Sequence, residues 1–220
     1  MVSRTDGRRP RTEVLSCNAA FELEARQTGA RLIAGVDEVG RGALAGPVVA
    51  AAVILDLERT PDGLNDSKKL TRAERERLDA EIRVSACAYA IARIEAGEID
   101  RLNILQATKE AMRCAIAALT PAPDYLLIDA VPLKDISLPQ RAIIRGDAQS
   151  VSIAAASIIA KVARDGWMRA YDEALPGYGF AKHVGYGTPE HLRGLSMLGP
   201  SPIHRLSFRG VLPDQVLFDV

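Results

Sequence analysis

Short apolar runs that alternate with helical repeats dominate the hydrophobic pattern of this chain. Strands are predicted where apolar residues run together between turn-forming residues, at 32–36, 48–55, 87–94, 125–128 and, more weakly, 142–144. Helices are predicted where apolar residues recur every three or four positions, at 14–27, 71–84, 102–119, 152–175 and 189–197. Three strands followed by alternating helix and strand predict an α/β fold, with a mixed sheet and helices on its faces.

Turn and capping residues set the ends of several of these elements. Thr71 followed by Glu74 has the spacing of a capping box, which opens a charged helix. Pro176 ends the long helix, because proline cannot continue one. Glycines at 40–46 predict a short connection, so the first two strands are expected to be neighbours.

Composition and charge narrow the class of protein. The chain of 220 residues is 48% hydrophobic and 25% charged, as is usual for one globular domain. Its formal net charge of +0 argues against a generally basic nucleic-acid coat, but says nothing of local patches. Three widely spaced cysteines without a CxxC pair argue against a disulfide framework and against a structural zinc site. They favour a protein of a reducing compartment.

The N-terminal segment, 1–12, holds four arginines and no apolar core of signal-peptide length. Its composition predicts a mobile tail or a loose arm that touches phosphates. The longest apolar stretch, 151–160, is too short to span a bilayer and is closed by Lys161. We therefore expect a cytoplasmic protein with no membrane contact.

Acidic residues stand at the ends of several predicted elements. Asp37 and Glu38 follow one apolar strand, Asp129 follows another, and Asp147 precedes the long helix. Carboxylates at strand ends converge if the strands are adjacent and parallel, and their hard oxygens suit magnesium or manganese. A single aspartate at a strand end is more often a turn former or a helix cap, so the pattern alone leaves convergence open.

Basic residues gather in four short clusters: Lys68 with Lys69, Lys161 with Arg164, Lys182 with His183, and His204 with Arg205. Each cluster is by default a solvated face, but together they could flank a groove that holds phosphates. The sequence leaves both interpretations open.

Motifs of other enzyme classes are missing from the sequence. It has no GxxxxGK[ST] loop and no GxSxG elbow, and 40–42 does not begin a dinucleotide-binding fingerprint. The histidines at 183, 191 and 204 lie far apart along the chain and lack helical metal-ligand spacing. Nucleotide kinase, serine protease and zinc hydrolase interpretations therefore have no support.

Six stretches of the chain resemble ribonuclease HII, the bacterial type 2 ribonuclease H. They are GVDEVGRG at 35–42, DSKKL at 66–70, NIL and AT within 103–108, LID at 127–129, the acidic site and helix at 146–165, and HVGYGT at 183–188. The resemblance covers about 33–208. One departure is Leu206, which follows His204 and Arg205 where the family commonly has a second arginine, and it bears on one peripheral phosphate contact.

The resemblance implies a ribonuclease H-like fold, with a five-stranded mixed sheet flanked by helices and a small C-terminal helical part. Residues 1–30 are then an N-terminal tail and helix, and 31–220 the catalytic domain with its C-terminal helical part. The family's metal ligands fall on four acidic residues, Asp37, Glu38, Asp129 and Asp147. Two Mg²⁺ or Mn²⁺ ions there would activate water and stabilise the leaving oxygen, giving 5′-phosphate and 3′-hydroxyl ends.

The resemblance also implies how the substrate is bound. Gly40, Arg41 and Gly42 would read the 2′-hydroxyl, which distinguishes RNA from DNA, and Tyr186 would meet the sugar on the DNA side. Ser67, Lys68, Lys69 and Lys161 complete the predicted substrate-binding residues. The expected substrates are RNA–DNA hybrids and duplex DNA with single ribonucleotides, cut on the 5′ side of the ribonucleotide, by a monomer that acts in ribonucleotide removal.

Two other functions remain as hypotheses. A DNA-junction nuclease or recombinase of the same fold superfamily would cut substrates that contain no ribonucleotide. A non-catalytic hybrid-binding module would bind without turnover, but the presence of all four acidic residues argues against it.

Overall fold

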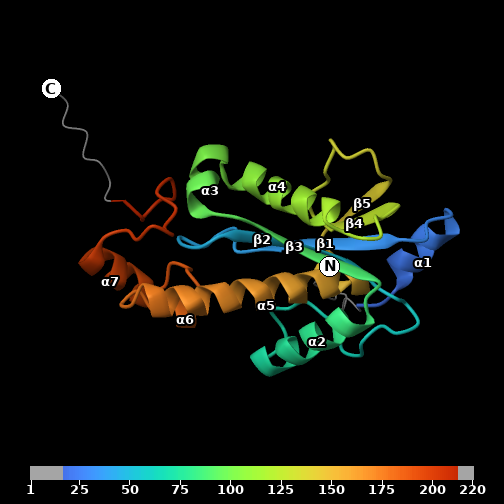
Figure 1. The fold of residues 1–220 in the computed structure, drawn as a ribbon, viewed down its shortest axis with the longest axis horizontal. Coiled ribbons are helices and arrows are strands. Elements are labelled where there is room, and N and C mark those ends of the chain that lie inside the picture. The colour runs from blue at the N-terminus through green and yellow to red at the C-terminus, as the bar shows by residue number, and fades with distance from the viewer. Residues whose placement is uncertain (1–16, 213–220) are drawn as a thin grey trace, which may run out of the picture.

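The computed structural model describes residues 17–212. Its centre is a five-stranded mixed sheet with the order β3-β2-β1-β4-β5, flanked by helices (Figure 1). The strands are β1 (Ile33–Val39), β2 (Val48–Ile54), β3 (Ala88–Ile94), β4 (Tyr125–Asp129) and β5 (Gln140–Ile143). The β1–β2 and β2–β3 pairs are antiparallel, whereas β1–β4 and β4–β5 are parallel. The predicted α/β class, the mixed sheet and the short β1–β2 connection are therefore confirmed.

Two helices cover opposite faces of the sheet, α4 (Ile104–Ala117) on one side and α5 (Val151–Ala174) on the other (Figure 1). The fully buried strand β2 serves both faces. Ala50, Ala52 and Ile54 belong to the cluster that includes residues of α4, while Val49 and Ala51 belong to the cluster that includes residues of α5. A strand packed on both sides needs a continuous apolar run, as its sequence has.

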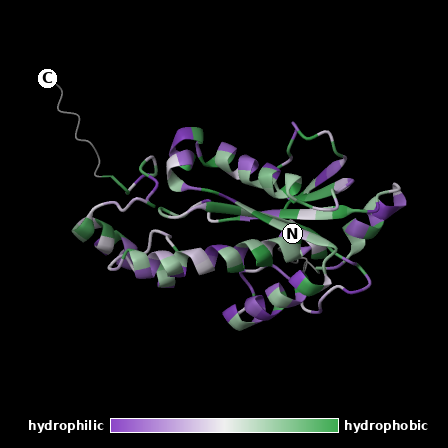
Figure 2. Ribbon diagram, viewed as in Figure 1, coloured by the Kyte–Doolittle hydropathy of each residue, from purple (hydrophilic) through white to green (hydrophobic). Residues whose placement is uncertain are grey.

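Three further helices surround this core: α1 (Ala20–Gln27), α2 (Arg72–Ser85) and α3 (Ala96–Leu102). Helix α2 is hydrophilic over much of its surface (Figure 2) and buries Leu78 and Ile82 beside α5. It begins at the predicted capping box, in which Thr71 accepts from the Glu74 N–H and Glu74 accepts from the Thr71 N–H. The C-terminal part holds the short α6 (Phe180–His183) and α7 (Pro189–Leu198).

A glycine lets α5 lie directly on the central strand. A side chain at Gly35 of β1 would place its Cβ 2.1 Å from the backbone carbon of Ser152, in the first turn of α5. Only a residue without a Cβ allows this approach. The contact fixes the start of α5, and with it the 3₁₀ turn η1 (Gly146–Ala148) that carries Asp147, against β1.

Two predicted helices differ from those observed. The first was expected over 14–27, but it begins at Ala20, because Asn18 pairs with Ser150 in an isolated bridge; residues 14–16 lie outside the described range. The helix expected over 102–119 is two helices, because Asn103 has a positive φ of 69° and breaks the chain between α3 and α4. The arginine-rich segment 1–12 also lies outside the described residues.

Strand ends and the segment between the last two predicted helices differ as well. Strands β1 and β4 run through Asp37, Glu38 and Asp129, so these acidic residues lie within strands and not after them. Strand β5 begins two residues earlier than predicted and ends one residue earlier, and α6 forms between the helices predicted at 152–175 and 189–197. Between residues 17 and 212, no helix is long and apolar enough to cross a membrane.

Candidate active site

Three of the four predicted acidic residues converge at one place on the sheet. Parallel pairing aligns Val36 of β1 with Ile128 of β4, so Asp37 and Asp129 are the next residues on neighbouring strands. Asp37, Glu38 and Asp129 each contribute a carboxylate oxygen to a group whose atoms all lie within 4.8 Å of one another. The convergence that the sequence pattern left open is thus observed for these three residues.

Asp147 borders this group from η1. The backbone N–H of its neighbour Gly146 donates to Asp129 Oδ1 at 2.7 Å, which ties η1 to β4. The Asp147 carboxylate lies 3.6 Å from Lys68 Nζ. Its pKa is raised by burial, by Asp66 and by Asp129, so these carboxylates share one electrostatic environment. The sequence did not single out Asp66, whose place in the DSKKL stretch was the only signal.

The acidic group is costly in the absence of a cation. Burial raises the pKa of Asp37 well above its ordinary range, and Glu38 and Asp129 raise it further. Burial also raises the pKa of Asp129 and that of Glu38. For Glu38, the nearby Arg41 acts in the opposite direction. Glu38 Oε2 is buried without a hydrogen-bond partner among the described residues. An unpaired oxygen among crowded carboxylates fits a site for hard divalent cations.

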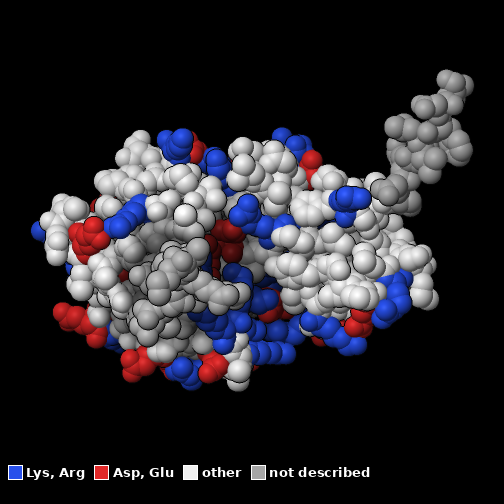
Figure 3. All heavy atoms as spheres, turned by 180° about the vertical axis from the view of Figure 1, so that it is seen from behind, with Lys and Arg blue, Asp and Glu red and all other residues white. Residues whose placement is uncertain are grey.

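Basic side chains line the approach to the carboxylates. Figure 3 shows Asp and Glu atoms at the bottom of a hollow, bordered by a band of Lys and Arg. Arg41 pairs with Glu38 at 3.2 Å, and Lys68 reaches Asp147 while its side chain stays 80% exposed. The overall charge of +0 therefore conceals a local basic surface beside the acidic group.

The Gly40–Gly42 turn lies beside Tyr186. A Cβ added at Gly42 would meet only Tyr186 Cε1, at 3.9 Å, and the Tyr186 side chain is about one-third exposed. The Leu44 N–H donates to Gly185 O at 2.8 Å, which joins the two loops. The predicted readers of the two sugars are therefore neighbours in space.

The remaining predicted substrate residues differ in accessibility. Lys69 is exposed, like Lys68. Ser67 is buried, and its hydroxyl lies 3.0 Å from that of Ser157 on α5. Lys161 pairs with Asp165 at 2.8 Å, and both side chains are largely buried. Ser67 and Lys161 thus already have partners within the protein.

Four residues of the predicted basic clusters are buried: Arg164, Arg205, His183 and His204. The interpretation of these four as phosphate contacts or solvated charges was therefore wrong. Leu206, the departure from the family pattern, is exposed, and its backbone N–H donates to Asp100 at 2.8 Å.

The three histidines, which the sequence separates, form one buried cluster. His191 Nε2 lies 3.0 Å from His204 Nε2, and the rings of His183 and His191 stack at 4.6 Å. The Ser201 N–H donates to His204 Nδ1, so His204 Nε2 carries the proton and donates to His191. His191 Nδ1 then donates to Tyr186 O at 3.0 Å. Burial, together with His191, lowers the pKa of His204 to about 4, which keeps the His204 imidazole neutral at neutral pH.

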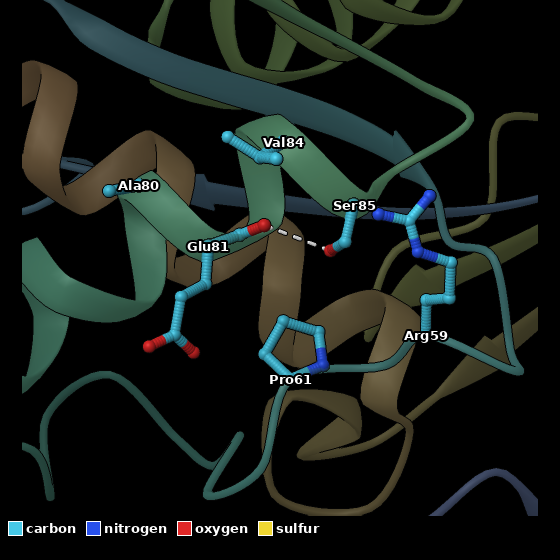
Figure 4. Close-up of a pocket in the computed structure, with 6 residues that line it drawn as sticks. All are labelled: Arg59, Pro61, Ala80, Glu81, Val84 and Ser85. Atoms are coloured by element: carbon cyan, nitrogen blue, oxygen red, sulfur yellow. Dashed lines mark hydrogen bonds between the residues drawn. The ribbon is translucent and has the colours of Figure 1, made fainter.

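A separate pocket lies beside the C-terminal end of α2, and none of the four acidic residues lines it. It is lined by Arg59, Pro61, Ala80, Glu81, Val84 and Ser85 (Figure 4). Among these residues the drawn hydrogen bond runs from the Ser85 hydroxyl to the Glu81 carbonyl, at 2.9 Å. No polar groups of the six converge on a common point, so this pocket is not the candidate site.

Comparisons with known proteins agree with one another. A family model described as Ribonuclease HII matches residues 34–211. Ribonuclease HII from Solibacter usitatus is 56% identical over 195 residues, covering 89% of this chain and 85% of that protein. The Enterococcus faecalis protein of the same name is 57% identical over 188 residues, covering 86% and 73%. The crystal structure of ribonuclease H2 from Pyrococcus horikoshii is similar with a TM-score of 0.69 at 26% identity, covering 82% of this chain and 95% of that one.

Proposed function

The chain belongs to the ribonuclease HII family and is an RNA–DNA hybrid endoribonuclease, and from this we propose that it also cuts duplex DNA on the 5′ side of a single embedded ribonucleotide. The observation that carries the proposal is the adjacency of three features. The convergent carboxylates of Asp37, Glu38 and Asp129 lie beside Arg41, and the turn that holds Arg41 lies against Tyr186.

Metal binding is assigned to Asp37, Glu38, Asp129 and Asp147, which would hold two Mg²⁺ or Mn²⁺ ions in the substrate complex. The buried, unpartnered oxygen of Glu38 and the raised carboxylate pKa values support this assignment. Bound divalent ions would supply activation of water and stabilisation of charge on the phosphodiester oxygens, leaving 5′-phosphate and 3′-hydroxyl ends. No side chain has to act as a nucleophile.

The protein's own groups bind and orient the duplex. In the described part of the chain, no hydrogen bond engages the backbone N–H groups of Arg41 and Gly42, and both residues are exposed. Backbone donors without a side chain in the way suit a 2′-hydroxyl and its phosphate. Lys68 and Lys69 would contact phosphates directly.

Two predicted substrate residues have narrower roles in this proposal. Ser67 supports the lysine loop from behind through Ser157 on α5. Lys161 reaches a phosphate only after leaving Asp165.

The division of the chain remains a proposal, with 1–30 as tail and helix and 31–220 as the catalytic domain. A monomer acting in the cytoplasm, in ribonucleotide removal from DNA, is likewise proposed. Light scattering during size exclusion tests the monomer, since a mass near twice 23.7 kDa would contradict it.

Cleavage mapping on three matched duplexes tests the proposal: one with a single ribonucleotide, one a continuous hybrid, and one all DNA. The enzyme is expected to cut on the 5′ side of the single ribonucleotide and to cut the RNA strand of the continuous hybrid. The all-DNA duplex should stay intact. Mg²⁺ or Mn²⁺ should restore activity after chelation and Ca²⁺ should not, because its larger, looser coordination misplaces the reacting groups. Cutting of the all-DNA duplex would favour a junction nuclease, and binding without turnover would favour a binding module.

A further inference from the structure

Two buried arginines lie directly beneath the loop that carries Arg41. Arg164 on α5 and Arg205 near the C-terminal end of the described chain are both 0% exposed. Neither forms an ion pair with any described carboxylate, although buried arginines are almost always paired. Their guanidinium groups are satisfied by backbone carbonyls. Burying an arginine without a counter-charge costs desolvation free energy, and this cost suggests that the position of those carbonyls is functionally important.

Arg205 donates hydrogen bonds to three backbone carbonyls of the loop that carries Arg41. Its Nη2 donates to Gly40 O at 2.7 Å and to Gly46 O at 2.9 Å, its Nη1 donates to Arg41 O at 2.8 Å, and its Nε donates to Gly46 O at 3.0 Å. The planar guanidinium is a rigid fork, so these bonds fix the orientation of the carbonyls as well as their position.

These bonds also determine where two N–H groups point. The carbonyl of Gly40 and the N–H of Arg41 belong to one peptide group, and the carbonyl of Arg41 and the N–H of Gly42 belong to the next. In a trans peptide the C=O and N–H point in opposite directions. Because both carbonyls face the buried Arg205, both N–H groups face away from it, and neither has an acceptor within residues 17–212.

Arg164 joins this turn to the tyrosine loop. Its Nε donates to Pro47 O at 2.9 Å and its Nη2 to Ala45 O at 3.1 Å, while its Nη1 donates to Val184 O at 2.9 Å. Its guanidinium carbon lies 5.7 Å from the centre of the Tyr186 ring. One side chain therefore bonds to both loops.

We propose that Arg164 and Arg205 are positioning residues, which hold the outward N–H donors of Arg41 and Gly42 at a fixed spacing from Tyr186. The two loops then read the sugars on either side of a ribonucleotide–deoxyribonucleotide step as one rigid unit. The inference rests on the proposed junction specificity and names what sets it. Discrimination between the two substrates depends on this spacing. Weakening the hydrogen bonds of either arginine should therefore lower the discrimination while leaving the acidic residues of the candidate active site in place.

The test is the ratio of kcat/KM on the single-ribonucleotide duplex to that on the continuous hybrid. Both values come from one preparation of the full chain, so the ratio does not depend on the fraction that is folded. Arg205→Lys keeps the charge but not the fork, and is expected to lower the ratio about 10-fold, mainly through kcat on the single-ribonucleotide duplex. Arg164→Lys should also lower the ratio, and this variant provides the test if Arg205→Lys gives too little folded protein.

Ile159→Val is the matched control. Ile159 is also fully buried on α5, but it belongs to the cluster that includes residues of β2 and not to the cluster that includes Ala45 and Val184 of the two loops. Its shortening should lower thermal stability and leave the ratio unchanged. If the arginine variants lower both rates equally and keep the wild-type ratio, the arginines only stabilise the fold and the inference is overturned. If the wild-type protein itself does not cut at a single ribonucleotide, the proposed function fails first.

Discussion

Gly40 and Gly42 lie two positions apart, and the structure gives a different reason for glycine at each. Gly40 has a φ of +90°, and a Cβ there would lie 2.1 Å from Arg164 Nε. Gly42 is not in the left-handed region, and a Cβ there would make one ordinary contact, with Tyr186. The fold therefore requires glycine at position 40 but not at 42, where the space is free for a substrate.

Gly42→Ala should leave stability nearly unchanged and lower kcat/KM by about 100-fold, because the added methyl group would stand where the proposed function places the sugar. Gly40→Ala should lower stability by about 1–3 kcal/mol from the backbone strain alone. Thermal melts and cleavage rates of both variants separate the two effects. A Gly42→Ala enzyme with wild-type kcat/KM would show that the substrate does not touch this backbone.

The hydroxyl and the ring of Tyr186 can be separated by mutation. Within the described structure no hydrogen bond engages the hydroxyl, whereas the ring lies against Gly42 and Arg164. Tyr186→Phe should therefore cut the single-ribonucleotide duplex within about threefold of the wild type, and Tyr186→Ala should lose about 100-fold in kcat with less effect on binding. Single-turnover rates and binding measurements would check this. A severe loss in Tyr186→Phe would mean that the hydroxyl holds a phosphate.

At the scale of elements, Asn103 decides that α3 and α4 are two helices. Its side chain accepts hydrogen bonds from the N–H groups of Leu105 and Gln106, which caps α4, and its positive φ turns the chain at this point. The apolar repeat runs through this position, which is why periodicity predicted one helix. Asparagine tolerates positive φ better than most residues and is a favoured N-cap.

Asn103→Ala should lower the free energy of unfolding by about 1–2 kcal/mol, since it removes the cap and places at positive φ a residue that tolerates this conformation less well than asparagine. Asn103→Gly should cost less, because glycine adopts positive φ freely. Urea denaturation of the two variants measures the difference. Equal stability of Asn103→Ala and the wild type would mean that the cap contributes nothing.

At the scale of the whole molecule, the carboxylate group links stability to pH and to metal. A carboxyl group whose pKa is higher in the folded protein than in the unfolded chain binds its proton more tightly when folded. Its protonation therefore favours the folded state, and this contribution is lost as pH rises from the unfolded pKa, about 4, through the raised folded value. Asp37, Glu38, Asp129 and Asp147 all shift in this direction. Bound cations would offset the loss.

Asp37→Asn should therefore abolish cleavage and, in chelator at neutral pH, raise the melting temperature above that of the wild type. It removes a buried negative charge with almost no change of shape, and each kcal/mol regained corresponds to about 2–4 °C for a domain of this size. Mg²⁺ should raise the melting temperature of the wild type more than that of the variant. Wild-type turnover in Mg²⁺, or a lower melting temperature in chelator, would contradict the assignment of Asp37.

The sequence by itself determined the features that depend on neighbouring residues. Alternating apolar runs located the five strands, and Thr71 with Glu74 located the start of α2, because strand burial and helix capping act over a few positions. The motifs around Asp37 and Asp129 indicated the candidate site, since a family resemblance is itself a local pattern.

Only the tertiary structure decided what depends on residues far apart in the chain. Arg164 and Arg205 look like surface charges in the sequence, but each is buried against carbonyls more than one hundred positions away. His191 and His204 meet because α7 packs beside the last described segment, a pairing that no spacing rule anticipates. A polar side chain is buried when distant backbone groups satisfy its hydrogen bonds, and that satisfaction exists only after the sheet, α5 and the loops have come together.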